Sequence, residues 1–117
     1  MQVFKFGGAS VNNIDRIKQV AEILKQYRDE KILVVISAMG KTTNALEKVV
    51  DAFVDHKSDE ALLLFEAIKQ QHINTSKYLV AKNQQSLNEQ LVNIFTEVEW
   101  LLHDKPVRDY DYYYDQV

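Results

Sequence analysis

The chain has 117 residues, and its 46% hydrophobic and 26% charged content matches one ordinary globular domain. It contains no cysteine, which excludes disulfides, thiolate metal sites and cysteine nucleophiles. The formal net charge of −3 argues against a nucleic acid as a partner, and the apolar runs, of about five residues, are too short to cross a membrane. The N-terminus shows no signal-peptide pattern, so we expect a cytoplasmic protein.

The opening of the chain predicts a βαβ unit. Residues 2–6 alternate weakly and end at two glycines, which suits a strand that runs into a tight turn. From Asn13 onwards the apolar side chains recur at helical spacing, with Asn12 or Asn13 as the N-cap. Residues 32–36, ILVVI, form a continuous apolar run typical of a strand buried on both faces. We therefore expect two parallel strands joined by a right-handed crossover helix.

Beyond residue 44 the pattern is helical throughout. Four helices are predicted, and their starts lie at Asn44, Ser58, Ser86 and Arg108. The second helix is expected to fade near residues 74–75, and the third opens with a capping box formed by Ser86 and Glu89. Pro106 breaks the chain ahead of the last helix, whose tyrosines are expected to pack against further sequence.

Two parallel strands cannot form a stable sheet of their own, because buried parallel strands need neighbours on both sides. The sequence therefore predicts an α/β fold in which the βαβ unit and the helical stretch are the first part of a larger domain.

Two polar loops follow the predicted strands, at the sheet edge where open α/β folds bind ligands. In the first, Gly7-Gly8-Ala9-Ser10 lets backbone N–H groups approach an anion, with Lys5 just upstream as a point charge. The second, SAMGKTTN at residues 37–44, offers three hydroxyls and further backbone N–H groups. Each loop alone also fits a simple connection between a strand and the next helix, because neither contains a Walker A or GxGxxG motif. Together they favour an anion-binding site.

The stretches KFGGAS, at residues 5–10, and VVISAMGKTTN, at residues 34–44, resemble the N-terminal part of aspartokinases, which are members of the amino acid kinase family. The resemblance implies that residues 1–117 are the N-terminal segment of an αβα sandwich of the amino acid kinase type, without the rest of that domain or any ACT domains. One departure is Ala9, where a threonine is more common.

The resemblance also implies a reaction and the residues that serve it. ATP, with Mg²⁺, would phosphorylate the β-carboxylate of L-aspartate to 4-phospho-L-aspartate, the first step of lysine, threonine and methionine synthesis. The catalytic residue would be Lys5, and the phosphates of ATP would be bound by Lys5, Phe6, Gly7 and Gly8. Thr43 would bind aspartate, with Ser37 lining the same pocket. No protein ligand for a metal is implied, the complete protein would be a homo-oligomer, and the 117 residues alone are expected to be inactive.

Two alternatives remain at this point. The first is a segment of another amino acid kinase, acting on glutamate, acetylglutamate, carbamate or a nucleotide, although the loop at residues 37–44 argues against it. The second is a non-catalytic helical interaction module, which the long helical half suggests.

Overall fold

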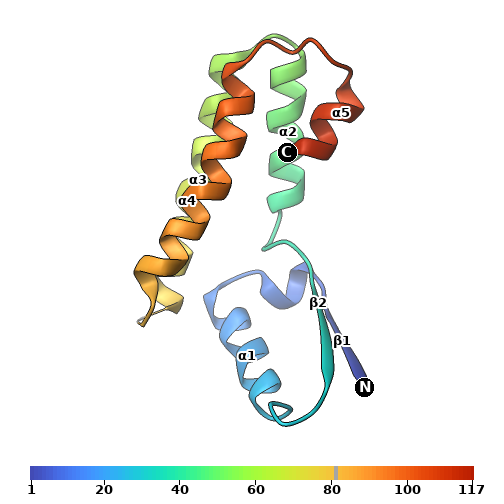
Figure 1. The fold of residues 1–117 in the computed structure, drawn as a ribbon, viewed down its shortest axis with the longest axis vertical. Coiled ribbons are helices and arrows are strands. Elements are labelled where there is room, and N and C mark those ends of the chain that lie inside the picture. Colours follow the sequence, from blue (N-terminus) through green and yellow to red (C-terminus); the bar gives the residue numbers. More distant parts are fainter. Residues whose placement is uncertain (81) are drawn as a thin grey trace. The chain divides into compact units, whose positions relative to one another are not determined.

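The computed structural model describes residues 1–80 and 82–117. In chain order the elements are β1 (Gln2–Phe6), a 3₁₀ helix η1 (Gly8–Val11), α1 (Ile14–Lys25), β2 (Ile32–Ile36), α2 (Thr42–Val54), α3 (Ser58–Leu79), α4 (Gln84–His103) and α5 (Tyr110–Gln116) (Figure 1). They fall into two compact units, Met1–Thr42 and Thr43–Val117. The expected order, an opening βαβ unit followed by helices, is confirmed. None of the helices described is long and apolar enough to cross a membrane.

The first unit is the expected βαβ arrangement. β1 and β2 pair in parallel, with Gln2 opposite Ile32 and Phe6 opposite Ile36. Three side chains from β1, η1 and α1 form its small core: Phe6, Val11 and Val20. Asn13 caps α1, because its Oδ1 accepts the N–H of Arg16 at 2.9 Å and so satisfies one of the donors left free at a helix start.

The expectation that β2 is buried on both faces is wrong. Successive side chains of a strand point to opposite faces, and α1 packs against one face only, where Phe4, Phe6 and Val34 lie. On the other face Leu33 and Val35 remain 50% and 46% exposed. Within residues 1–42, all of which the structure describes, no element covers that face, so the apolar run of β2 is half open.

The second unit is built from the four remaining helices. Its core gathers fully buried side chains, the largest of which are Phe53, Leu102, Val49 and Val50. Phe65 of α3 meets Phe95 of α4 edge to face, with ring centroids 5.9 Å apart. The ring contact therefore joins α3 to α4, and fully buried side chains of the core come from α2, α3 and α4 alike.

α2 begins at Thr42 and not at Asn44. The N–H and the hydroxyl of Thr42 both donate to the Met39 carbonyl, and Thr42 is buried, so the first turn forms two residues early. Asn44 is left exposed within that turn, and its expected role as the cap is wrong.

α3 and α4 also differ from their expected bounds. α3 continues past residues 74–75 to Leu79, and within it the hydroxyls of Thr75 and Ser76 donate back to carbonyls of their own helix. α4 begins at Gln84, directly after Asn83 in the left-handed region with φ of 60°. Ser86 and Glu89 lie inside the helix, so the predicted capping box does not form.

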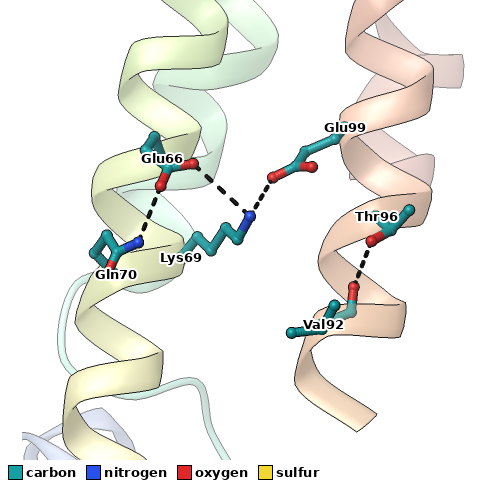
Figure 2. A network of polar contacts seen from close by, with 6 residues as sticks. All are labelled: Glu66, Lys69, Gln70, Val92, Thr96 and Glu99. Atoms are coloured by element: carbon teal, nitrogen blue, oxygen red, sulfur yellow. Dashed lines mark hydrogen bonds and ion pairs between the residues drawn. The ribbon is translucent and has the colours of Figure 1, made fainter. Parts of the chain in front are cut away.

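A polar contact joins α3 to α4 (Figure 2). The Lys69 ammonium donates to Glu99 Oε1 at 2.8 Å and lies 3.9 Å from a Glu66 oxygen. The side chains of Lys69 and Glu99 are only 22% and 28% exposed. The hydrogen bond to Glu99 raises the pKa of Lys69 above its usual value of 10.5.

Glu99→Gln is expected to lower the unfolding free energy by about 1 kcal/mol at about pH 9, since it removes the charge partner of Lys69. A lysine whose pKa is raised in the folded state stabilises the fold below 10.5, and that contribution is lost as the pH rises through the raised pKa. Urea unfolding of the protein that carries these residues, followed by circular dichroism at about pH 9 and pH 11.5, measures both effects.

The gap between the wild-type protein and Glu99→Gln should therefore close at the higher pH. Tyrosines titrate in both proteins and cancel in the comparison. A gap that stays constant over this range would mean that the Lys69 charge is not what Glu99 stabilises.

Candidate functional site

The two polar loops lie at the same edge of the sheet, because parallel strands end on the same side. The N–H of Ser37, just after β2, donates to the Phe6 carbonyl at the end of β1 at 2.9 Å. After β1 the chain turns at Gly7 into η1, where the Ser10 N–H donates to the Gly7 carbonyl at 2.9 Å. The first unit thus places the start of η1 beside the loop that follows β2.

The loops pack backbone against backbone at Gly8. A Cβ added there would lie 3.4 Å from the Gly40 carbonyl oxygen and 3.7 Å from that of Ala38. Gly40 itself has φ of +56°, a left-handed conformation that favours glycine. A Cβ on Gly40 would lie 3.1 Å from Asn12 Oδ1. By contrast, nothing lies within 4 Å of a Cβ added at Gly7.

The two side chains at the end of β1 point to opposite faces. Phe6 is 8% exposed and fills the core of the first unit, so it offers a ligand only its backbone. Lys5 is exposed and lies opposite Val35, on the face of the sheet that α1 does not cover. Among the described residues no ion pair involves Lys5. Its charge is therefore available to an anion.

The first unit brings five of the six candidate residues to one sheet edge: Lys5, Phe6, Gly7, Gly8 and Ser37. Ser37 is exposed, and its Oγ would lie 3.9 Å from a Cβ at Gly8. The sixth, Thr43, begins the second unit and lies exposed in the first turn of α2.

In the second unit Thr43 borders a hollow of about 190 Å³. Its lining comes from one face of α2 and from the C-terminal end of α5: Thr43, Leu46, Glu47, Val50, Tyr114 and Val117. Glu47 was not predicted from the sequence, because Thr43 was expected to lie in a loop. Once α2 begins at Thr42, the spacing of four residues puts Thr43 and Glu47 on the same helix face.

Next to this hollow, α5 makes a polar contact with α2. The pKa of Tyr110 is raised to about 12, because its packing removes water from the phenol and because Asp51 accepts its hydrogen bond. The neighbouring acids Asp51 and Glu47 add to the shift, since each disfavours a phenolate. At neutral pH Tyr110 therefore stays protonated and remains a donor.

Among residues 1–80 and 82–117 no group of three or more His, Asp or Glu side chains is arranged to hold a metal ion. The polar groups at the sheet edge are instead a lysine, backbone N–H groups and hydroxyls. Those groups bind anions such as phosphates and carboxylates.

The sequence matches a family of known proteins over most of its length. The model of the amino acid kinase family matches residues 1–105. Over 81 residues the chain is 42% identical to aspartokinase 2, chloroplastic, of Arabidopsis thaliana, a match that covers 66% of this chain and 14% of that protein. Over 46 residues it is 54% identical to an aspartate kinase of Stutzerimonas stutzeri, covering 38% of this chain and 11% of that protein. The matches thus span only a small part of these relatives.

Proposed function

Because the chain belongs to the amino acid kinase family, we propose that residues 1–117 form the N-terminal segment of an aspartokinase domain. The complete protein that carries this segment would transfer the γ-phosphoryl group of ATP to the β-carboxylate of L-aspartate, giving ADP and 4-phospho-L-aspartate. This is the entry to lysine, threonine and methionine synthesis. The observation that carries the proposal is the close packing of two glycine loops beside the free charge of Lys5.

The phosphate end of the site is assigned to β1 and η1. The first N–H groups of a helix have no partner within it, and Gly7 has no side chain with which to cap η1. Backbone donors at Gly7 and Gly8 therefore face the phosphates, with Phe6 contributing its backbone alone. The Lys5 ammonium neutralises charge on the transferring phosphoryl group, and a strand holds it in place. Phosphoryl transfer is mostly positioning and charge stabilisation, which these groups supply.

The aspartate end is assigned to the loop after β2 and to the start of α2. The family resemblance assigns the binding of aspartate to Thr43, whose hydroxyl would hydrogen-bond a carboxylate, and to Ser37. Mg²⁺ would enter as the complex of ATP, held mainly by the phosphates and by water. We also propose, from the family resemblance, a cytoplasmic site of action and a homo-oligomeric complete protein, which cell fractionation and light scattering would test.

Acceptor specificity tests the proposed function directly. ADP release by the purified complete protein, measured in a coupled assay with Mg-ATP, should depend on L-aspartate. Glutamate, acetylglutamate and carbamate serve as the competing acceptors. Release that depends on one of these and not on aspartate would assign the chain to another branch of the amino acid kinase family.

Thr43→Val should raise the KM for aspartate by about 10- to 100-fold and leave the KM for ATP nearly unchanged. The substitution keeps the shape of the side chain but removes the hydroxyl, and a hydrogen bond to a charged ligand contributes about 1.5–3 kcal/mol. Initial rates of the complete protein, with each substrate varied in turn, measure the two constants.

Thr96→Val on α4 is the matched control, because its hydroxyl bonds only to the Val92 carbonyl of the same helix (Figure 2). It should leave both constants at their wild-type values. A rise in the KM for ATP with Thr43→Val would instead assign this part of the site to the nucleotide.

A further inference from the structure

α5 lies beside α2 (Figure 1), and residues of both helices line the hollow that Thr43 borders. Thr43, Val50 and Phe53 follow one another on α2 at spacings of seven and three residues, which keeps them on one side of the helix. α5 places Tyr113 against Phe53 and Val117 at the hollow that Thr43 borders. α5 thus contacts α2 at Phe53, and its last residues border the same hollow as Thr43.

Tyr113 is the anchor of this contact. It is 3% exposed, and its ring meets that of Phe53 edge to face with centroids 5.0 Å apart. Its hydroxyl accepts the N–H of Val107 at 2.9 Å and the N–H of Arg108 at 3.1 Å. Because these two N–H groups belong to the segment before α5, one side chain ties that segment, α5 and α2 together.

α5 depends on this anchor for its place. Among the residues of α5 (Tyr110–Gln116), Tyr113 is the buried one. Asp109 caps the helix by accepting the Tyr112 N–H at 3.1 Å. At the other end the Val117 N–H donates to the Tyr113 carbonyl at 3.0 Å. The position of Val117 beside the hollow is thus set through Tyr113.

We propose that Tyr113 is a positioning residue for aspartate, because by docking α5 on α2 it fixes the wall of the hollow opposite the Thr43 hydroxyl. Tyr114 and Val117 form that wall. When the wall moves away, water competes for the Thr43 hydroxyl and aspartate binds less tightly. The phosphate loops belong to the first unit and make no part of this wall. The inference rests on the aspartate role proposed for Thr43.

Tyr113→Phe tests the inference in the complete protein. The variant keeps the ring that packs on Phe53 and loses the two hydrogen bonds to the segment before α5. The KM for aspartate is expected to rise about 5- to 10-fold, while the KM for ATP and the kcat at saturating aspartate stay within about twofold. Asp109→Ala, which removes the exposed cap of α5, should raise the same constant by about two- to fivefold.

Tyr112→Phe is the matched control. It removes a tyrosine hydroxyl from the same helix but keeps the ring that contacts Tyr113 and Arg108. Its constants should equal those of the wild-type protein.

The possible results distinguish failure of the role proposed for Tyr113 from failure of the proposed function. If Tyr113→Phe lowers the Tm but leaves the KM for aspartate unchanged, the tyrosine is structural only and the inference is overturned. An equal rise of both KM values would overturn it as well, since that reports general damage. If the wild-type protein shows no aspartate-dependent ADP release, the proposed function fails, and the inference fails with it.

Discussion

Lys5→Ala in the complete protein is expected to lower kcat by about 100- to 1,000-fold while the KM for aspartate stays within about threefold. Lys5 is exposed at the end of β1, and no carboxylate among the described residues pairs with it. In the proposed function the Lys5 charge stabilises the negative charge of the transferring phosphoryl group, so its loss would raise the barrier of the chemical step. Steady-state kinetics with each substrate varied in turn measure the effect.

Two further substitutions make this result specific. Lys5→Met keeps the aliphatic stem, which covers the open sheet face beside Val35, and removes only the charge. It should lose as much activity as Lys5→Ala. Lys18→Ala removes an exposed charge from α1 in the same unit and should leave the kinetics unchanged. If Lys5→Ala keeps more than about half of the wild-type activity, Lys5 has no part in the mechanism.

The elements that the sequence predicted correctly depend on local interactions. The strands at residues 2–6 and 32–36 end where glycine or polar residues interrupt an apolar run, and both bounds are confirmed. The capping role of Asn13 follows from its own side chain and the N–H three residues later. Such features need no knowledge of the rest of the chain.

The errors concern the first residue of two helices and the burial of β2. Asn44 and Ser86 are good capping residues in isolation, but the chain enters each helix two residues earlier, through Thr42 and after Asn83. The apolar run of β2 reads as buried on both faces, although α1 packs against only one of them. Burial depends on which element packs against a residue, and the apolar run alone does not identify that element. The early helix starts have a local cause, because Thr42 donates to Met39 and Asn83 adopts the left-handed conformation.

The sequence singled out the residues of the candidate site but not the contacts between the two loops. Lys5 and the two glycines after β1 stand out because a charged side chain and an accessible backbone follow directly from the residue types. Gly40 was not singled out, yet its left-handed φ and its carbonyl beside Gly8 bring the two loops together. Tyr113 was expected to pack against further sequence, whereas it packs against Phe53 of this chain. Both contacts join residues more than 30 positions apart, which spacing alone does not reveal.

Gly8→Val is expected to destabilise the first unit by about 1–3 kcal/mol and to lower kcat/KM by about 100-fold. A Cβ at Gly8 already reaches ordinary contact with the Gly40 and Ala38 carbonyls, so the two further methyl groups of valine must push the loops apart. Gly8→Ala adds only that Cβ and should be much milder. Thermal unfolding and initial rates of the complete protein record stability and activity separately.

A substitution at the neighbouring Gly7 distinguishes a role in stability from a role in binding the ligand. A Cβ at Gly7 meets nothing within 4 Å, and Gly7 has φ of −76°, which any residue adopts. Gly7→Ala should therefore leave the unfolding free energy within about 0.5 kcal/mol of the wild-type value. If phosphate approaches the backbone there, the new methyl group stands in its way and the KM for ATP rises with no loss of stability. An unchanged KM for ATP in a stable Gly7→Ala protein would move the phosphate site away from Gly7, and a destabilised one would contradict the open space that the structure shows.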